Sequence, residues 1–469
     1  MTRPGEALRR GRSAPPPQGP TLRFQGGTLL LHGVAADALP PGFSWDGRVG
    51  AGRGLARDYA ACVEALHAHG LVDEAQAYAK LPELRLLSPR TTRDYQEEAL
   101  GAWRQARRRG VVILPTGAGK SHVAERAIAE VRRASLVVVP TLDLVAQWVG
   151  ILRAAFGVEI GIVGGGHHEV RDLTVTTYDS AAIHMDRLGH RFGMVVWDEV
   201  HHLPAPAYAR AAEGCIAPFR LGLTATPERP DGLHMALGEL VGPMVYRREI
   251  PELAGDFLAP YRTEVITVRL SDEEQAQYDA LRGRYRAFVD GAGIAMGGPA
   301  GWRRFLRESA RSREGRAAFR AFLDARRIAH GTERKLELVE ALVAQEWGRR
   351  TLVFTNDNDT AYRIAERLLA PCITHHTDVA ERRAWLDAFG AGEVRVLVTS
   401  RVLNEGVDMP SAEVAIVASG TSTVRESVQR LGRILRPQPG KQAVLYELVA
   451  DGTTETRASA RRREHDAYR

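Results

Sequence analysis

The 469-residue sequence contains few cysteines and few lysines, and it has no long apolar run. Its three cysteines, Cys62, Cys215 and Cys372, lie far apart and form no CxxC pair, which argues against a disulfide framework and a cysteine-ligated zinc site. No apolar run approaches the roughly 18 residues that a membrane span requires. The first 20 residues have arginines and prolines but no apolar core, so they do not resemble a secretory signal. These absences predict a cytoplasmic protein that does not contact a membrane.

Lysine occurs only four times, at Lys80, Lys120, Lys335 and Lys441, although lysine and arginine together number 63 against 57 acidic residues. The net charge of +6 indicates a polyanionic partner such as nucleic acid. Because nearly all of the positive charge is arginine, the setting of each lysine is informative. Lys120 stands in a glycine-containing turn and is therefore the first candidate functional residue.

Alternating β-rich and helical stretches predict an α/β protein with two parallel-sheet domains, at 91–255 and 335–450. Short, almost wholly apolar runs are typical of strands that are buried on both faces of a parallel sheet. The first domain has such runs at 111–114, 136–139, 173–177, 194–197 and 220–223, with a helical pattern at 142–156. The second domain repeats this plan with runs at 351–354, 395–399, 414–418 and 443–449.

Four other segments differ in composition from these two domains. We expect residues 1–20 to be a disordered basic arm and residues 21–90 to form a small N-terminal α+β domain that begins with a hairpin. Residues 256–334 are expected to form a helical, arginine-rich insert, and residues 451–469 a polar basic tail. The chain is thus predicted to place two α/β domains in tandem, with an insert between them.

The segment PTGAGKS, at 115–121, follows a predicted buried strand and opens a predicted helix. Backbone N–H groups and the helix dipole at such a position bind phosphate oxygens, and glycines let the backbone approach them closely. Lys120 is expected to reach the β- and γ-phosphates and Ser121 to contact Mg²⁺. The strict GxxxxGK[ST] pattern is not met, because Leu114 stands at its first glycine. The residues predicted to bind ATP here are Pro115, Thr116, Gly117, Ala118, Gly119, Lys120 and Ser121.

The segment MVVWDEVHH, at 194–202, places two carboxylates and two histidines after an apolar run. Its spacing alone allows a metal cluster, a paired-carboxylate hydrolase or a triphosphatase. The phosphate loop favours the triphosphatase, in which Asp198 would hold Mg²⁺ and Glu199 would orient and deprotonate the attacking water. A zinc site would need HExxH or another ligand set, and His201-His202 offers neither. A glycosidase would leave the phosphate loop unexplained.

Four motifs in this order resemble those of superfamily-two helicases: PTGAGKS, DEVHH, LTATP at 223–227 and QRLGRILRP at 429–437. The combination of DEVH with QRLGRxLRP is most similar to the XPB-like branch, whose type member is the xeroderma pigmentosum group B helicase. The resemblance covers about residues 91–450. It implies two RecA-like motor domains that bind ATP and Mg²⁺ between them. It also implies an ATP-dependent DNA helicase or translocase of 3′-to-5′ polarity that acts in DNA repair.

The resemblance assigns further residues by their position in these motifs. Gln96 and Arg93, in RDYQ, would lie near adenine. Thr224 and Thr226 would couple hydrolysis to movement through His201. The remaining assignments lie in the second motor domain: Gly406 and Asp408 facing the nucleotide cleft, and Gln429, Arg433 and Arg436 in the motif that supplies two arginine fingers.

DNA contacts are also implied by the resemblance, at Thr141 and Thr177, in the segments similar to motifs Ia and Ib, and at Arg229. The insert has twelve arginines between residues 282 and 327 and stands where the family has a thumb. Arginines bind phosphates and exposed aromatic rings stack on bases, but aromatic residues at helical spacing more often form a core. The candidate DNA-binding arginines of the insert are Arg303, Arg304 and Arg307, whereas Phe305, Phe319 and Phe322 are expected to be core residues.

Several alternatives stay open on the sequence alone. Pro230 replaces the glutamate of a family Arg-Glu-Asp element linked to duplex opening, so a double-stranded DNA translocase or remodeller is one alternative. A restriction-type motor with nuclease activity is another, with Asp324, Glu333 and Lys335 as its candidate residues. An RNA helicase would usually carry DEAD or DEAH. The predicted partners are single-stranded or forked DNA and, as an alternative, a nuclease. The chain is expected to act as a monomer associated with the nucleoid, with residues 21–90 facing nucleic acid or regulating the motor.

Overall fold

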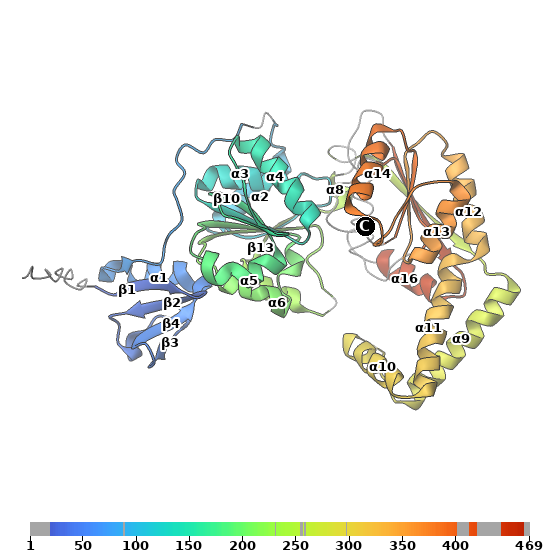
Figure 1. Cartoon of the computed structure of the whole chain (residues 1–469), viewed down its shortest axis with the longest axis horizontal. Coiled ribbons are helices and arrows are strands. Elements are labelled where there is room, and N and C mark those ends of the chain that lie inside the picture. Colours follow the sequence, from blue (N-terminus) through green and yellow to red (C-terminus); the bar gives the residue numbers. More distant parts are fainter. Residues whose placement is uncertain are drawn as a thin grey trace, which may run out of the picture.

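The computed structural model describes residues 19–87, 90–229, 231–253, 257, 259–296, 298–400, 412–419 and 442–463. These residues form three sheets, which follow one another along the longest axis of the molecule (Figure 1). A five-stranded sheet lies at one end, an eight-stranded sheet lies in the middle, and a six-stranded sheet lies at the other end. Among the described helices, none combines the length and the hydrophobicity needed to pass through a membrane.

The N-terminal unit is a mixed sheet with the strand order β3-β4-β2-β1-β5, covered by helix α1. The predicted hairpin is confirmed, since β1 and β2 pair antiparallel around a two-residue turn, Gly26-Gly27. Leu22, Leu29 and Leu31 are fully buried and share one hydrophobic cluster with strands of the middle sheet. The unit is therefore packed on its neighbour. Its elements are β1 (Thr21–Gln25), β2 (Thr28–His32), β3 (Phe43–Asp46), β4 (Ala51–Leu55), α1 (Tyr59–Leu66) and β5 (Val72–Asp73).

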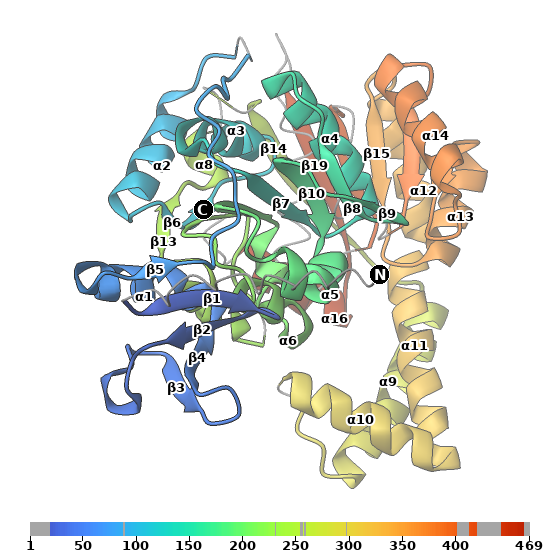
Figure 2. The same cartoon turned by 60° about the vertical axis from the view of Figure 1, so that its left-hand side comes forward.

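The first motor domain has the strand order β13-β6-β12-β11-β7-β10-β8-β9, in which only β9 is antiparallel to its neighbour. Its central strands coincide with the apolar runs predicted from the sequence, and their side chains are almost all buried because helices cover both faces (Figure 2). The strands are β6 (Arg109–Ile113), β7 (Ser135–Val139), β8 (Gly161–Gly164), β9 (His167–Glu169), β10 (Leu173–Thr177), β11 (Met194–Asp198), β12 (Phe219–Thr224) and β13 (Met244–Arg247).

Helices connect these strands in the alternating pattern that parallel pairing requires. Helix α4 begins and ends at the two residues predicted from its apolar spacing. The helices are α2 (Asp94–Gln105), α3 (Lys120–Val131), α4 (Leu142–Phe156), α5 (Tyr178–Leu188), α6 (Pro206–Glu213), α7 (Leu237–Leu240) and α8 (Ile250–Leu253). A short 3-10 turn, η4 (Val200–His202), follows β11.

The second motor domain is a wholly parallel sheet with the strand order β14-β19-β18-β15-β17-β16. Its first strand differs from the sequence expectation. β14 (Tyr261–Val268) lies in the range assigned to the helical insert, but it pairs with β19 over eight residues. The other elements are β15 (Thr351–Phe354), α13 (Asn358–Leu368), β16 (Cys372–Ile373), α14 (Val379–Ala391), β17 (Val396–Thr399), β18 (Val414–Val417) and β19 (Ala443–Ala450).

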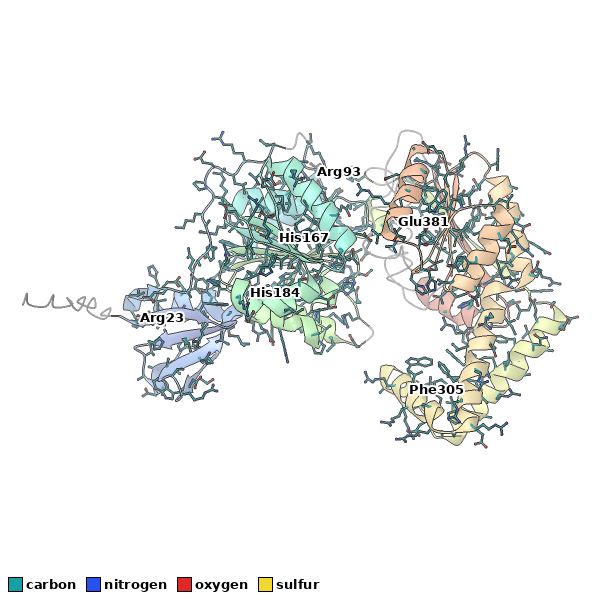
Figure 3. The ribbon with its side chains drawn as sticks, in the orientation of Figure 1. Arg23, Arg93, His167, His184, Phe305 and Glu381 are labelled. Atoms are coloured by element: carbon teal, nitrogen blue, oxygen red, sulfur yellow. The ribbon has the colours of Figure 1, made fainter. Side chains whose placement is uncertain are left out.

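The insert leaves the second sheet as a long helical extension (Figures 1 and 2). Helices α9 (Asp272–Gly291) and α11 (Arg313–Gly331) pack along each other, α10 (Pro299–Arg311) packs on α11, and α12 (Glu333–Gln345) returns to the sheet. Phe305, labelled in Figure 3, is fully buried among Tyr285, Trp302 and Phe322. Phe319 and Phe322 are partly buried against the same cluster, so the expectation that these aromatic residues form a core is confirmed.

The C-terminal segment also differs from its expected character as a polar tail. Residues 454–463 form a helix, α16 (Thr454–Arg463). Glu455, in its first turn, is buried and forms an ion pair with Lys335, with a Nζ–Oε2 distance of 2.6 Å. Glu455 is thus part of the domain core although its surrounding sequence is polar. It can be buried because it pairs with Lys335, which lies 120 residues earlier in the sequence.

Candidate active site

The sequence motifs meet at one edge of the middle sheet. In a parallel α/β sheet, the carboxyl ends of adjacent strands lie together and form the ligand-binding edge. Strands β6, β12, β11 and β7 are neighbours in this sheet. The phosphate loop follows β6, Thr224 ends β12, Asp198 ends β11 and Thr141 follows β7. Four segments that lie up to about a hundred residues apart in the sequence are therefore brought to one site.

The phosphate loop has the backbone conformation that its glycines permit. Gly117 and Gly119 have φ angles of 88° and 78°, in the left-handed region where residues with a Cβ are strained. A Cβ at Gly119 would also lie 2.6 Å from the Gln96 side-chain nitrogen. Lys120 and Ser121 open α3 directly after this turn, so the first N–H groups of a twelve-residue helix face the site.

Gln96 holds this loop from the side of the predicted adenine site. Its Nε2 donates to the carbonyl oxygens of Ala118, at 3.0 Å, and Gly119, at 3.4 Å. Its Oε1 accepts from the backbone N–H of Arg93, at 3.0 Å. Gln96 is only 3% exposed, so the side chain that makes these three bonds is largely shielded from water. Gln96 thus joins the segment that begins α2 to the phosphate loop.

The loop is chemically suited to a triphosphate. The Nζ of Lys120 donates to the carbonyl oxygens of Leu114, at 3.2 Å, and Pro115, at 3.5 Å, so the ammonium group lies over the loop. The Thr116 hydroxyl is buried and has no hydrogen-bond partner among the described residues. A buried hydroxyl without a partner is costly in a folded protein. A bound phosphate oxygen would accept from this hydroxyl and from the Lys120 ammonium group.

Asp198 is fixed by three neighbours. Its Oδ2 accepts from the indole N–H of Trp148 at 2.8 Å, and its Oδ1 accepts from the Glu199 N–H at 3.0 Å. The Tyr178 hydroxyl donates to its backbone carbonyl at 2.9 Å. Burial raises the pKa of Asp198, although the Lys120 charge and the hydrogen bonds from Trp148 and Glu199 oppose that rise. Trp148 was not predicted from the sequence, because an apolar residue in a helical pattern gives no signal for this contact.

Asp198 and Ser121 fit a Mg²⁺ ion, which proteins usually bind through one or two side-chain oxygens together with substrate phosphates and water. The Asp198 carboxylate is held in one orientation by its two donors, and each of its oxygens keeps a lone pair for a metal. Ser121 stands on the first turn of α3, next to the phosphate loop.

Glu199, Thr224 and His201 form a connected polar group beside Asp198. Glu199 has a left-handed backbone, with φ at 47°, and its side chain is 16% exposed. The Thr224 hydroxyl lies 3.0 Å from His201 Nδ1 and 3.5 Å from Glu199 Oε2. Thr226 joins the group through its N–H, which donates to the Thr224 hydroxyl at 3.2 Å. His201 is fully buried, and its Nδ1 faces the Thr224 hydroxyl.

Arg229 connects this group to the segment after LTATP. Its Nη1 donates to the His201 carbonyl oxygen at 2.7 Å, and its guanidinium forms an ion pair with Asp231, with an Nη2–Oδ2 distance of 2.7 Å. The hydrogen bond from Arg229 lowers the pKa of Asp231 to about 2. The predicted DNA contact of Arg229 is not tested by this geometry, and Pro230 lies outside the described residues.

Two of the predicted DNA contacts have helix-capping roles. The Thr141 hydroxyl accepts from the Leu144 N–H at 3.3 Å, and the Thr177 hydroxyl accepts from the Ser180 N–H at 3.2 Å. These bonds begin α4 and α5, which follow the adjacent strands β7 and β10. The N-termini of two helices, with their positive dipole ends, therefore lie at the same edge of the sheet.

The three candidate arginines of the insert are all exposed on α10. Arg304 donates to the carbonyl oxygens of Gly293 and Ala292, both at 3.1 Å, and so closes the end of α9. Arg307 Nε lies 3.5 Å from Glu308 Oε1, whereas Arg303 makes no hydrogen bond or ion pair with another described residue. Arg304 thus has a structural role that the sequence pattern did not predict.

The nuclease candidates do not assemble. Lys335 is fully buried, and its Nζ donates to the Ala418 carbonyl at 2.9 Å and to Glu455. Glu333 is half exposed and pairs with Arg363 at 3.1 Å, while Asp324 pairs with Arg327 at 3.4 Å. Each of these three residues thus pairs with a different partner, and they do not form a common site.

The other half of the predicted ATP site lies outside the described residues. This applies to Gly406 and Asp408 and to the motif with Gln429, Arg433 and Arg436. Their roles therefore stay predictions. In the chain, these two segments come after β17, which ends at Thr399, and after β18, which ends at Val417.

Family models match three parts of the chain. Residues 22–75 match the xeroderma pigmentosum group B helicase damage recognition domain. Residues 90–229 match the type III restriction enzyme res subunit, and residues 334–438 match the helicase conserved C-terminal domain. The restriction-enzyme match covers only the first motor domain, so it does not separate a restriction motor from other motors.

Two curated relatives and one solved structure show where the chain belongs. It is 39% identical to the DNA 3′-5′ translocase XPB2 of Sulfurisphaera tokodaii, over 94% of this chain and 99% of that relative. It is 32% identical to the DNA 3′-5′ helicase XPB of Mycobacterium tuberculosis, over 79% of this chain and 62% of that relative. The Pyrococcus furiosus Hef helicase domain shares its fold, with a TM-score of 0.53 at 19% identity over 80% of this chain and 98% of that one. The chain therefore belongs to the XPB-like branch of the superfamily-two helicases, as the motifs indicated.

Proposed function

We propose that this chain is an ATP-driven motor that moves 3′ to 5′ on DNA and acts in DNA repair. The observation that carries the proposal is the polar group at the shared edge of β6, β12 and β11. There, the phosphate loop, Asp198 and Glu199, and the His201–Thr224 pair meet on three neighbouring strands. A relative that the chain matches over nearly its whole length carries the name of a DNA translocase.

Each residue of this edge has a chemical role in the proposed hydrolysis. Lys120 binds the terminal phosphates, and Ser121 and Asp198 hold Mg²⁺. When bound, Mg²⁺ neutralises negative charge on the phosphate oxygens. Glu199 orients water and accepts its proton, since a carboxylate held by its surroundings but open to solvent can do both.

Coupling between hydrolysis and movement is proposed to pass through Thr224. Its hydroxyl lies between Glu199 and His201, so a change at the carboxylate reaches the histidine through one side chain. His201 in turn is bonded through its carbonyl to Arg229, on the segment that follows β12. In the proposal, Arg433 and Arg436 complete the site from the second domain, and closing of the two domains is the step that moves the chain along DNA.

The proposal also includes the remaining features of the motor. DNA is proposed to run across the carboxyl edges of both sheets, with contacts at the N-termini of α4 and α5 and at the exposed arginines of α10. The chain is proposed to work as a monomer, because the sequence carries both halves of the ATP site. A nuclease partner stays an alternative.

The deciding experiment measures ATP hydrolysis with single-stranded DNA, duplex DNA and RNA. We expect DNA to stimulate hydrolysis, and we expect Glu199→Gln to lower it by about 10²- to 10⁴-fold, the usual contribution of a general base. Glu340→Gln is the matched control, since Glu340 is a surface glutamate paired with Arg367 on α13. Stimulation by RNA alone, or full activity of Glu199→Gln, would contradict the proposal.

A second candidate is translocation without strand separation. It is favoured by Pro230, which removes the family glutamate between Arg229 and Asp231 and leaves these two residues bound to each other. Displacement of a triplex-forming strand reports movement on duplex DNA, and unwinding of a forked duplex reports strand separation. Triplex displacement without unwinding would support the translocase, and activity in both assays would support the helicase.

A further inference from the structure

Arg93, Tyr95 and Phe257 form a compact cluster at the start of α2. The Nη1 of Arg93 donates to the Tyr95 hydroxyl at 3.0 Å and to the Phe257 carbonyl oxygen at 3.3 Å. The guanidinium carbon of Arg93 lies 5.6 Å from the centre of the Phe257 ring. The Tyr95 and Phe257 rings meet edge to face, with their centres 4.9 Å apart. Phe257 therefore contacts Arg93 both with its ring and with its backbone.

This cluster is bonded to the phosphate loop. The Tyr95 hydroxyl, which accepts from Arg93, donates to the Ala118 carbonyl oxygen at 2.7 Å. The same carbonyl accepts from Gln96. Tyr95 is 4% exposed, so its two hydrogen bonds are sheltered from water. The Tyr95 side chain thus lies between the phosphate loop, to which it is hydrogen bonded, and the ring of Phe257.

Phe257 lies on the connection between the two motor domains. It follows α8, where its N–H donates to the Leu253 carbonyl oxygen at 3.0 Å. It precedes by four residues the start of β14, which is an edge strand of the second sheet. Figure 1 shows α8 on the side of the first domain that faces the second, and Figure 3 shows Arg93 on that same side.

We propose that Phe257 positions the Arg93 guanidinium for the base of the bound nucleotide, and so makes the connection between the motor domains part of the base site. The inference rests on the proposed ATP-driven function and deepens it. A guanidinium plane stacks well on aromatic faces, including that of a purine, and loses less freedom on binding when it is already held in place. Phe257 supplies this hold through its ring and its carbonyl oxygen.

The main test compares ATP with ribose 5′-triphosphate, which has the phosphates and sugar of ATP but no base. In Phe257→Leu, which keeps most of the volume but removes the ring, we expect kcat/KM for ATP to fall about three- to tenfold, as expected for loss of a partly desolvated cation–π contact. The loss should appear mainly in KM. Hydrolysis of ribose triphosphate should be unchanged, because no base is there to be positioned. Phe257→Tyr, which keeps the ring, should restore the preference for ATP.

A double-mutant cycle with Arg93→Ala tests whether Phe257 acts through Arg93. In the Arg93→Ala background, Phe257→Leu should have no further effect on the ratio of ATP to ribose triphosphate activity. Phe219→Leu is the matched control, since Phe219 also lies under two arginines, Arg108 at 6.0 Å and Arg133 at 5.7 Å, but begins β12 at the opposite end from Thr224.

Two results with Phe257→Leu would overturn the inference. One is an equal loss of activity with ATP and with ribose triphosphate, which would mean a structural fault. The other is a preference for ATP over ribose triphosphate that is the same as in the wild type. A wild-type protein without DNA-stimulated hydrolysis would instead refute the proposed function itself. Hydrogen exchange gives an independent measurement: ADP, but not pyrophosphate, should slow exchange in the peptide between α8 and β14 of the wild type, and this difference should be lost in Phe257→Leu.

Discussion

Replacing Lys335 by methionine tests how the C-terminal helix is held in the second motor domain. Lys335 is fully buried, and its ammonium group lies 2.6 Å from Glu455 Oε2 and 2.9 Å from the Ala418 carbonyl oxygen. Glu455 is 8% exposed in its side chain and also accepts from the Ala450 N–H at 2.9 Å. Methionine fills a similar volume but leaves the Glu455 carboxylate buried without its cation.

The expected loss is large, because breaking one side of a buried ion pair typically costs about 3–5 kcal/mol. For a unit of roughly 200 residues, each 1 kcal/mol lowers the melting temperature by about 2–4 °C. The unfolding temperature of the second motor domain should therefore fall by about 6–20 °C. The double variant Lys335→Met, Glu455→Met should recover most of this loss, since two apolar residues often replace a buried pair at little cost.

The measurement must follow the second domain alone, because domains of one chain can unfold separately. Hydrogen exchange in peptides that contain β15, β18 and β19, recorded during heating, gives this resolution. Arg363→Met is the surface control: Arg363 pairs with Glu333, and both side chains are about half exposed, so the cost should be about 0–1 kcal/mol. If Lys335→Met melts no earlier than Arg363→Met, the buried pair and the docking of α16 are refuted.

Two further predictions concern Asp198 and Asp357. Trp148→Phe removes the indole donor that orients Asp198. We therefore expect ATP turnover or Mg²⁺ affinity to fall about 10- to 100-fold. An unchanged dependence of hydrolysis on Mg²⁺ concentration would contradict this expectation. Burial would raise the pKa of Asp357, but hydrogen bonds from His330 and the Thr360 N–H outweigh it and lower the pKa from 3.8 to about 2. Because the folded pKa is the lower one, this carboxylate stabilises the fold above about pH 4 and loses that effect as the pH falls towards 2. Asp357→Asn should abolish this contribution, of about 1–2 kcal/mol for a side chain that is one-third exposed, and acid unfolding curves of the two proteins should converge near pH 2.

The sequence alone predicted the motor architecture well, for a physical reason that can be seen in its strands. β10 and β15 begin and end at the predicted residues, and so does helix α4. Strands buried on both faces are rich in apolar and β-branched residues, so they stand out in the sequence. β14 was missed because it is an edge strand with partly exposed side chains, and its residues, YRTEVITV, mix polar and apolar types.

The phosphate loop and the DEVHH segment were also readable from the sequence, because each is a short segment at the end of one strand. The phosphate loop needs only its own glycines, Lys120 and the helix that follows. The side chains that contact functional or buried charged residues could not be predicted, because they lie far away in the sequence. Trp148 meets Asp198 across 50 residues, and Lys335 meets Glu455 across 120.

What the sequence by itself determined is thus the order of the elements and the chemistry carried within single turns. Only the tertiary structure decided which side chain orients Asp198, which carboxylate neutralises Lys335, and that Phe257 lies against Arg93. The periodicity of a segment reports whether its residues face the core, but it does not report which distant residue they meet there. That choice depends on how helices and strands pack, and packing is a property of the whole chain.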